Sequence, residues 1–243
     1  MSCPRVKAFL LSAGVGSRLR PLTDNTPKCL LPVLGRPLLD YWMENLAQAG
    51  VSEVLLNTHW LADQVEDYAA SRKGQAPAIR LFHEPELLGS AGTIAACADW
   101  AADADIILSL YGDLLVTEPL SRTIAFHQSH GRPFTLSVAH ADEPWRRGIA
   151  TVDESGIVVR FVEKPAQPES DLAGAGIYAF SPELLPEIVA LRDEVGLPFD
   201  LGFHLIPALV GRMKALEIEG IVHDIGTMEA YEEAQKIAEH WQI

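Results

Sequence analysis

The sequence is poor in cysteine and in basic residues, and it contains no long apolar run. Its three cysteines among 243 residues, Cys3, Cys29 and Cys97, are scattered along the chain. An odd and dispersed set of this kind fits neither a disulfide framework nor a metal site, so we expect a reducing, cytoplasmic environment. The chain has no stretch of about 18 apolar residues and therefore no predicted membrane-spanning helix.

Acidic residues outnumber basic ones by 33 to 19, which gives a formal net charge of −14 at pH 7. This charge argues against nucleic acid as a partner, because the backbone phosphates would be repelled. A phosphorylated small molecule is compatible with it, provided that a local cluster of cations and a divalent metal bind the phosphates. The first apolar run begins at Val6, so we expect no signal peptide before it.

The composition, 48% apolar and 21% charged, predicts one large globular domain with a substantial core. In the first half of the chain, buried strands alternate with amphipathic helices. The predicted strands are Val6–Leu11, Glu53–Asn57, Ile79–Phe82 and Ile106–Leu110, and the predicted helices are Leu38–Ala49, Ala62–Lys73 and Ser90–Ala101. This order predicts a three-layer α/β/α sandwich around a mixed, mostly parallel sheet, with ligands at the carboxyl ends of the strands.

In the second half the pattern changes to short strands separated by turn residues. We predict strands at Thr135–Ala139, Ala150–Val152, Ile157–Val162 and Gly176–Phe180, with a hairpin at Glu154–Gly156. Helical patterns return near Phe203–Val210 and from Thr227 onward, and the chain shows neither a linker nor a repeat.

The most informative segment is a glycine loop directly after the first strand. Gly14 and Gly16 lack a Cβ, so backbone N–H groups can turn toward an anion. Arg18 and Lys28 add full positive charges. The loop is not a P-loop, because no Gly-Lys-Ser/Thr ending closes it, and position 19 lacks the third glycine of the dinucleotide fingerprint. The combination favours a triphosphate ligand.

The segment Leu11–Pro32 resembles the signature of the sugar-1-phosphate nucleotidyltransferases, L-x-[AG]-G-x-G-[ST]-R-[LM]-x-P-L-T-x(3)-P-K-x-[LM]-x-P, at nearly every fixed position. The resemblance extends to about Gln235 and is greatest to the mannose-1-phosphate guanylyltransferase branch. It implies a single Rossmann-like nucleotidyltransferase domain over residues 1–243, with a nucleotide-binding half (1–135) and a sugar-phosphate-binding half (136–243). The C-terminal β-helix domain of some relatives is not expected.

The reaction implied by this resemblance is attack of a sugar-1-phosphate oxygen on the α-phosphorus of a nucleoside triphosphate, with release of pyrophosphate. The attacking oxygen is already ionised at pH 7, so positioning and charge neutralisation suffice. Arg18 would hold the departing pyrophosphate and Lys28 the α-phosphate. The segment His83–Gly92 resembles the family's P-L-G-T-A-G loop. The predicted nucleotide-binding residues are Leu11, Ala13, Gly14, Gly16, Ser17, Glu84, Gly89 and Ser90.

Two carboxylates are predicted to hold Mg²⁺, which prefers oxygen ligands. Asp113 follows a strand and a glycine, and is also predicted to be catalytic. Asp224 stands in a segment similar to the family's D-x-G-T motif. Alternatives stay open, since Gly112–Asp113 is also an ordinary turn and Asp224 could cap the last helix, for which Thr227 is the better N-cap. The Asp103–Asp105 pair, a D-x-D as in metal-dependent glycosyltransferases, precedes its strand and is interpreted as a solvated turn.

The predicted sugar-phosphate-binding residues are Gly148, Glu163, Lys164 and Gly176. The segment Val162–Pro165 is similar to the family's V-E-K-P motif, which implies that Lys164 grips the acceptor phosphate and Glu163 accepts hydrogen bonds from sugar hydroxyls. Gly174 stands where many relatives have asparagine, which puts a hexose acceptor in doubt. Beside the sugar glycine, Arg146 and Arg147 suggest recognition of an extra anionic group, or else a basic surface loop.

We therefore predict a Mg²⁺-dependent enzyme that uses GTP and resembles mannose- or heptose-1-phosphate guanylyltransferases. Uridylyl or thymidylyl transfer to another sugar-1-phosphate stays open. A regulatory subunit that binds nucleotide-sugars without catalysis is a second alternative, and a glycosyltransferase with a similar core is a third. Homo-oligomer formation also stays open.

Overall fold

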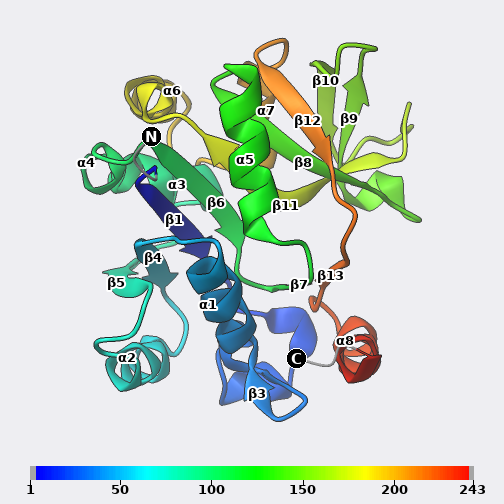
Figure 1. Cartoon of the computed structure of the whole chain (residues 1–243). Coiled ribbons are helices and arrows are strands. Elements are labelled where there is room, and N and C mark those ends of the chain that lie inside the picture. The colour runs from blue at the N-terminus through cyan, green and yellow to red at the C-terminus, as the bar shows by residue number, and fades with distance from the viewer. Residues whose placement is uncertain (1–3, 241–243) are drawn as a thin grey trace. The chain divides into compact units, whose positions relative to one another are not determined.

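The computed structural model describes residues 4–240 and contains two compact units that are discontinuous in sequence (Figure 1). Unit 1 comprises the residues up to Lys7, Leu88–Leu110 and Ser121–Glu219. Unit 2 comprises Ala8–Leu87, Tyr111–Leu120 and the residues from Gly220 onward. The predicted division at residue 135, into a nucleotide-binding half and a sugar-phosphate-binding half, concerns function and not compactness. It stays a prediction.

Unit 2 contains the predicted first strands. The order β1-β4-β5 joins β1 (Val6–Leu11), whose first two residues belong to unit 1, β4 (Glu53–Thr58) and β5 (Ala78–His83). Strands β4 and β5 are parallel. Ala8, Phe9 and Leu10 are completely buried, which is why β1 is apolar without alternation after Lys7.

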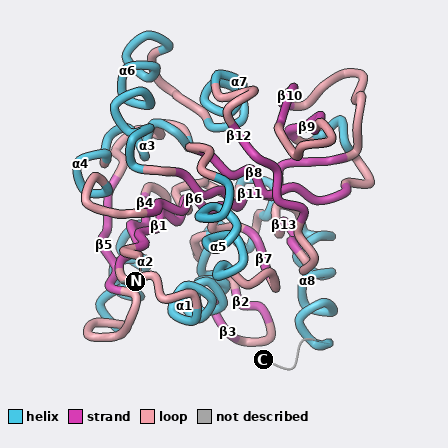
Figure 2. Tube along the Cα trace, turned by 45° about the horizontal axis from the view of Figure 1, so that its top comes forward, coloured by secondary structure: helices cyan, strands magenta, loops and turns pink. Residues whose placement is uncertain are grey.

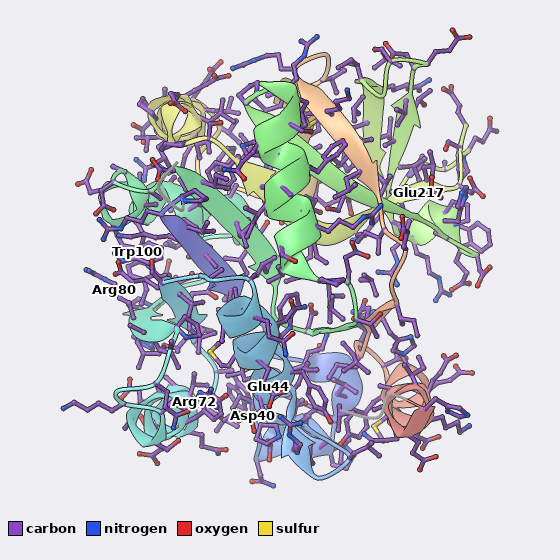
Figure 3. The ribbon with its side chains drawn as sticks, in the orientation of Figure 1. Asp40, Glu44, Arg72, Arg80, Trp100 and Glu217 are labelled. Atoms are coloured by element: carbon purple, nitrogen blue, oxygen red, sulfur yellow. The ribbon has the colours of Figure 1, made fainter. Side chains whose placement is uncertain are left out.

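Two helices of unit 2 match the predicted ranges. In α1 (Leu38–Gln48) the apolar residues recur at helical spacing and face the core: Leu38, Leu39, Trp42, Met43 and Leu46. Helix α2 (Ala62–Ser71) is tied to α1 by Arg72, whose guanidinium lies 3.2 Å from Asp40 Oδ1 (Figure 3). The hydroxyl of Tyr68 donates a 2.7 Å hydrogen bond to the same carboxylate.

Unit 1 contains a mixed sheet with the strand order β10-β9-β11-β6, which continues to the start of β1. Its strands are β6 (Ile106–Tyr111), β8 (Phe134–His140), β9 (Gly148–Val152), β10 (Val158–Glu163), β11 (Leu172–Phe180) and β12 (Met213–Glu217). Strand β11 pairs antiparallel with β6, β8 and β9, and β12 pairs parallel with β8. The predicted hairpin is confirmed, because β9 and β10 pair antiparallel on either side of Gly156.

The helices of unit 1 are α3 (Ser90–Ala96), α4 (Ala98–Ala101), α5 (Leu120–His130), α6 (Leu185–Val195) and α7 (Ile206–Ala208). Helices α3 and α6 lie next to each other (Figure 2). The single helix predicted over Ser90–Ala101 is interrupted at Cys97, where φ is −112°. The helix predicted near Phe203 begins as a π-helical turn, Leu201–Leu205, which leads into α7.

Two short sheets and a C-terminal helix complete unit 2. Strands β7 (Leu114–Val116) and β13 (Val222–Asp224) pair antiparallel, as do β2 (Pro32–Val33) and β3 (Arg36–Pro37). Helix α8 (Met228–His240) starts at Thr227, whose Oγ1 accepts a 3.2 Å hydrogen bond from Ala230 N. The prediction that Thr227, and not Asp224, caps this helix is confirmed.

Two of the three cysteines lie among the described residues. Cys29 and Cys97 are free thiols, whereas Cys3 lies outside the described part of the chain. Burial raises the pKa of the Cys29 thiol to about 12, so this side chain is an inert core residue. Among residues 4–240, no helix has the length and apolar character needed to cross a membrane.

Candidate active site

The glycine loop of unit 2 is fixed at its start by a buried polar chain. Ser12 N donates to Asn57 Oδ1 at 2.6 Å, and Asn57 Nδ2 donates to Glu84 Oε1 at 2.8 Å. Asn57 and Glu84 are 5% and 1% exposed. The ends of β4 and β5 therefore hold the loop by hydrogen bonds that are strong because they are shielded from water. Glu84 supports the glycine loop through its hydrogen bond with Asn57. A direct contact of Glu84 with a nucleotide base stays a prediction.

Gly14 and Gly16 have different surroundings within this loop. A Cβ built on Gly14 meets no atom within 4 Å, whereas one on Gly16 would lie 2.9 Å from Thr23 Cγ2. Gly16 also has φ +67°, and its carbonyl accepts a 2.8 Å hydrogen bond from Thr23 Oγ1. Gly16 is thus required by the fold, while Gly14 leaves open space for a ligand.

After the glycines, the loop continues as short 3₁₀ turns that present the cations. Ser17 and Arg18 are exposed on the turn Ser17–Leu19, and Lys28 begins the turn Lys28–Leu30. Leu11 is half-buried, and Ala13 is 6% exposed. The residues predicted from the signature therefore occupy one continuous segment of unit 2.

Lys28 lies between the two carboxylates predicted to bind metal. Its Nζ is 2.6 Å from Asp113 Oδ2 and 3.5 Å from Asp224 Oδ1. The Lys28 side chain is 8% exposed, and the two carboxylates are 39% and 27% exposed. One cation and two anions thus form an ion triad with its ammonium inside and its carboxylates toward solvent.

The small β7–β13 sheet brings these carboxylates together. Asp224 pairs with Leu114 in the antiparallel register, and Ile225 N donates to Asp113 O at 3.2 Å. Gly112 makes the approach to the glycine loop possible, because a Cβ there would lie 2.0 Å from Ser12 Oγ. Its N–H donates to Leu11 O at 2.9 Å.

Arg18 belongs to the same site through Gly226. A Cβ built on Gly226 would lie 2.8 Å from Asp224 Oδ1 and 3.0 Å from Arg18 Nη2. The glycine of the D-x-G-T segment thus leaves room for a carboxylate and a guanidinium on the same side of the backbone.

An apolar cluster supports these polar loops from within unit 2. It consists of Leu19, Leu31, Val33, Leu38, Leu115, Ile225, Ala234 and Ala238. Leu19 and Ile225 are direct chain neighbours of Arg18 and Asp224, and both are completely buried. A fully buried leucine or isoleucine stabilises a fold by about 1.5–3 kcal/mol, so the cluster fixes the backbone that presents the charges.

The pair Asp113 and Asp224 fits Mg²⁺ as a donor set. Mg²⁺ is usually held by one or two carboxylates, with substrate phosphates and water as its other ligands. In the described part of the chain, no group of three or more histidine, cysteine or acidic side chains has the arrangement of a metal site. Two converging carboxylates without a third protein ligand match a metal that arrives with a phosphorylated substrate.

Unit 1 contains the predicted sugar-phosphate residues on the β9–β10 hairpin. Glu163 pairs with Gly148 across the two strands. A Cβ on Gly148 would lie 2.4 Å from Glu163 Oε2, and a Cβ on Gly202 would lie 2.5 Å from the same oxygen. Two glycines therefore flank the carboxylate. Burial raises the pKa of Glu163, and the charge of Lys164 opposes this shift.

Lys164 follows Glu163 and points its ammonium back toward the same place. Its Nζ lies 3.9 Å from Glu163 Oε1 and 5.6 Å from the centroid of the Phe203 ring. Its backbone has φ +50°, and its N–H donates to Arg147 O at 2.9 Å. The two adjacent arginines differ, because Arg146 pairs with Glu143 at 3.2 Å, whereas the charge of Arg147 acts on the Glu163 carboxylate.

The predicted nucleotide loop residues Gly89 and Ser90 lie in unit 1 and contact the segment before the π-helical turn. A Cβ on Gly89 would lie 2.4 Å from Phe199 O, so the room left by this glycine is occupied by protein backbone. Ser90 Oγ donates to Asp200 Oδ2 at 2.8 Å and accepts from Leu201 N at 2.8 Å. A contact of either residue with nucleotide stays a prediction.

The glycines of β11 lie where the strand changes register. Gly176 is buried with φ +71°, between the two stretches of β11 that pair with β8. A Cβ on Gly174 would make ordinary contacts, the nearest at 3.5 Å with the Tyr178 hydroxyl oxygen. The backbone therefore does not require glycine at position 174, and the missing side chain leaves space beside Tyr178.

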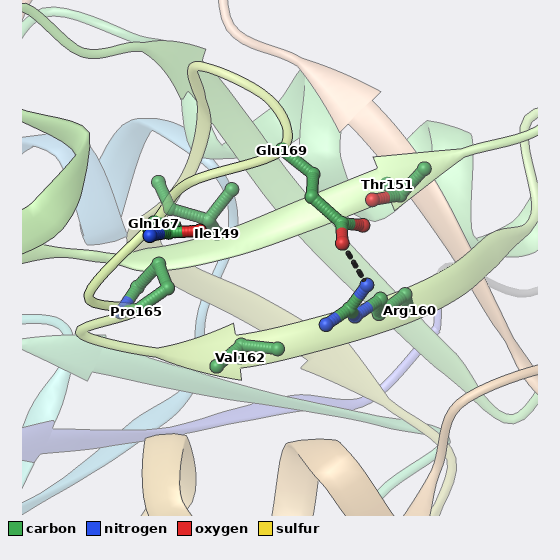
Figure 4. Close-up of a pocket in the computed structure, with 7 residues that line it drawn as sticks. All are labelled: Ile149, Thr151, Arg160, Val162, Pro165, Gln167 and Glu169. Carbon is green, nitrogen blue, oxygen red and sulfur yellow. Dashed lines mark ion pairs between the residues drawn. The ribbon is translucent and has the colours of Figure 1, made fainter.

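Two other candidate sites, the Asp103–Asp105 pair and a hollow beside β9 and β10, do not include these residues. Asp103 pairs with Lys7 Nζ at 2.7 Å and Asp105 accepts from Arg5 N at 2.7 Å, so the D-x-D pair anchors the start of β1. A hollow beside β9 and β10 is drawn in Figure 4. It is lined by Ile149, Thr151, Arg160, Val162, Pro165, Gln167 and Glu169. In the alternating strands, these positions of β9 and β10 face away from Glu163.

Several site residues were missed by the sequence analysis. Asn57 is a polar residue at the end of a buried strand, and this signal could have identified it. Asp200, Gly202 and Phe203 carried no such signal, because their roles depend on contacts with β10 and the start of α3.

Comparison with known proteins identifies the family. The model of the family described as Nucleotidyl transferase matches residues 7–240, and the chain belongs to this family. It is 34% identical over 226 residues to the mannose-1-phosphate guanylyltransferase catalytic subunit beta of Xenopus tropicalis. The aligned residues cover 91% of this chain and 61% of that relative. The catalytic subunit beta of Drosophila melanogaster is 33% identical over 224 residues, with coverage of 90% and 59%. The chain spans about three-fifths of the length of these relatives.

Solved structures show the same fold. A candidate glucose-1-phosphate thymidylyltransferase from Bacillus anthracis has a TM-score of 0.85 at 22% identity, covering 96% of this chain and 95% of that chain. HddC from Yersinia pseudotuberculosis has a TM-score of 0.76 at 24% identity, covering 96% and 99%. The predicted fold class, a Rossmann-like arrangement of helices around a mixed, mostly parallel sheet, is confirmed.

Proposed function

We propose that the chain transfers a nucleotidyl group from a nucleoside triphosphate to a sugar-1-phosphate, with GTP as the nucleotide. The observation that carries this proposal is the ion triad of Lys28, Asp113 and Asp224 next to a glycine loop. A binding protein without catalytic activity would have no need for two carboxylates that converge on one buried ammonium. Family membership supports the reaction class. The names of the relatives from Xenopus and Drosophila support guanylyl transfer.

In this proposal an ionised oxygen of the sugar phosphate attacks the α-phosphorus, and the bond to the β-phosphate oxygen breaks as pyrophosphate leaves. Lys28 places a positive charge at the α-phosphate, and Arg18 binds the leaving pyrophosphate with its planar fork of donors. Asp113 and Asp224 would hold Mg²⁺, which would supply positive charge that neutralises the phosphates. Preorganised charges of this kind lower the barrier without reorganising during the reaction.

Unit 1 supplies the acceptor residues in the proposal. The Glu163 carboxylate accepts hydrogen bonds from sugar hydroxyls, because in the described part of the chain it has no hydrogen-bond donor of its own and glycines flank it. Lys164 binds the acceptor phosphate, and the backbone at Gly148 faces the sugar. The absence of a side chain at Gly174 accommodates an acceptor different from that of relatives with asparagine there.

The test is pyrophosphate release over a grid of five nucleoside triphosphates and a panel of sugar-1-phosphates, with and without Mg²⁺. We expect one strong combination that contains GTP and disappears when Mg²⁺ is removed. Asp113→Asn and Asp224→Asn should abolish that activity, while Asp103→Asn, which changes a carboxylate outside the site, should retain it. Full activity of Asp113→Asn, or turnover without any divalent cation, would contradict the proposal.

A further inference from the structure

We propose that Phe203 is a positioning residue of the acceptor site. Its ring holds the Lys164 ammonium and forms a flat apolar floor for the carbohydrate ring of the acceptor. This inference rests on the proposed function, since it assigns a further residue to the acceptor half of that reaction.

The exposure of Phe203 is the first observation. Its side chain is 55% exposed, although it belongs to a turn whose neighbours Leu201, Gly202 and Leu205 are buried. Scattered exposed apolar residues are common, and exposure alone indicates nothing. Leu197 and Val159 are similarly exposed. Phe203 is distinguished by its polar neighbours.

Lys164 is the second observation. Its side chain is 58% exposed, and its Nζ lies 5.6 Å from the Phe203 ring centroid, within the range of a cation–π interaction. Its other neighbour, the Glu163 carboxylate, is 3.9 Å away, beyond hydrogen-bond distance. A long exposed side chain loses conformational entropy when it is held in one place, so the aromatic face is a substantial part of what directs this ammonium.

The backbone that carries Phe203 is the third observation. Asp200 Oδ1 accepts hydrogen bonds from Gly202 N at 2.8 Å and Phe203 N at 3.2 Å. The other oxygen of Asp200 accepts from Ser90 Oγ. Gly202 packs directly against the Glu163 carboxylate. The turn is π-helical, a conformation that is rare and often found at functional sites.

These contacts gather a carboxylate, an ammonium and an exposed aromatic face around one short turn. Small-molecule sites typically combine apolar or aromatic walls with a few polar groups that fix orientation. A sugar phosphate offers the matching groups, since it has hydroxyls for Glu163, a phosphate for Lys164 and a C–H face for the Phe203 ring.

The test compares acceptor and nucleotide kinetics of the full chain with four variants. For the sugar phosphate that the wild type uses, we expect Phe203→Ala to raise the acceptor KM about tenfold, with the KM for nucleotide changed less than twofold. Phe203→Tyr keeps an aromatic face and should stay within threefold of the wild type. Phe203→Leu keeps apolar bulk without that face and should behave as Phe203→Ala. Val159→Ala is the control for removing an exposed apolar side chain of unit 1.

An unchanged acceptor KM in Phe203→Ala overturns the inference, as does full rescue by Phe203→Leu, which would show a packing role. If the wild type forms no product, calorimetric titration with mannose-1-phosphate and glucose-1-phosphate separates the two proposals. Binding that is lost in Phe203→Ala supports the acceptor site and contradicts the proposed reaction. Equal binding by both proteins overturns the inference, and no binding by the wild type overturns both.

Ser90→Ala is a fifth variant, and it leaves the Phe203 ring in place. It removes the hydrogen bonds that link Ser90 to Asp200 and Leu201, and thereby loosens the turn. We expect a higher KM for the acceptor. A change in the nucleotide KM alone would contradict the inference that Ser90 positions the turn that carries Phe203. It would indicate that the Ser90 hydroxyl contacts the nucleotide.

Discussion

Lys28 Nζ lies 2.6 Å from Asp113 Oδ2, although the two residues are 85 positions apart in the sequence. The lysine is 7% exposed, so its charge is held in place by protein before any substrate binds. A buried ammonium of this kind is stabilised by its carboxylate partners, and its interaction with a phosphate is less screened by water than that of a surface lysine.

Replacing Lys28 should therefore damage catalysis strongly. We expect Lys28→Ala to lower kcat/KM by a factor that corresponds to about 2–4 kcal/mol of transition-state stabilisation, as for other lost electrostatic contacts. Steady-state kinetics with the preferred substrates measures this loss. Lys73→Ala, which removes an exposed lysine after α2, should leave kcat/KM unchanged. A decrease below tenfold in Lys28→Ala would remove Lys28 from the α-phosphate.

The two glycines of the loop should respond differently to alanine. Gly14→Ala should leave the melting temperature unchanged, because its Cβ meets nothing in the protein, and should raise the KM for nucleotide by filling ligand space. Gly16→Ala should lower the melting temperature, because alanine at φ +67° is strained and would press on Thr23. Thermal unfolding and nucleotide kinetics of both variants check this pair. Equal effects of the two variants on stability would show that Gly14 also has a structural role.

The two arginines beside Gly148 should also differ. Arg147→Glu places a negative charge near Glu163 and Lys164, so we expect a higher KM for an anionic acceptor. Arg146→Glu changes a side chain that pairs with Glu143 at the surface, and it should leave that KM unchanged. The comparison should be made with two sugar phosphates, one of which carries an additional carboxylate. Identical acceptor KM values in both variants would assign the pair to an ordinary basic surface loop.

His127 should make the stability of unit 1 dependent on pH. Its Nδ1 lies 2.8 Å from Thr135 Oγ1 and its Nε2 lies 3.2 Å from Ser181 Oγ. Burial, with a smaller contribution from His130, lowers its pKa from 6.5 to about 4. The folded state thus favours neutral His127. Its contribution is complete above pH 6.5 and is lost as the pH falls toward 4, by about 3 kcal/mol in total.

Urea unfolding at pH 7.0 and pH 4.5 measures this effect. The wild type should lose about 2–3 kcal/mol more between the two pH values than His127→Gln, which does not titrate there. His140→Gln is the matched control, because His140 is exposed and its pKa is raised by Asp171 rather than lowered. Equal losses in the wild type and His127→Gln would show that His127 does not control the acid sensitivity.

Local patterns predicted much of the fold and of the charged site. The run Val6–Leu11, apolar except for Lys7, is typical of a buried strand in an α/β protein. The helix after Pro37 shows its core face directly in the spacing of Leu38, Trp42 and Leu46. Asp113 was predicted because a carboxylate after a strand and a glycine must lie at a sheet edge. These features depend on neighbours in the sequence, which is why the sequence alone defines them.

Other contacts depend on tertiary partners and could not be predicted. The sequence analysis predicted that Gly89 binds nucleotide, but it could not show that the backbone of Phe199 occupies the space left by this glycine. The hydrogen bond of Ser90 could not be predicted for the same reason, since its partner Asp200 is 110 residues away. Strands β7 and β13 have three residues each, too few for a recognisable alternation.

The β7–β13 pairing also has a consequence for how the site comes into being during synthesis of the chain. Lys28 and Asp224 are 196 residues apart, and contacts of such high sequence separation form late because the intervening chain must first be ordered. A ribosome completes the glycine loop and Asp113 long before it delivers Asp224. A nascent chain that has not yet added β13 therefore has half of the carboxylate pair and a lysine with one partner, so the ion triad is complete only when the last segment joins the fold.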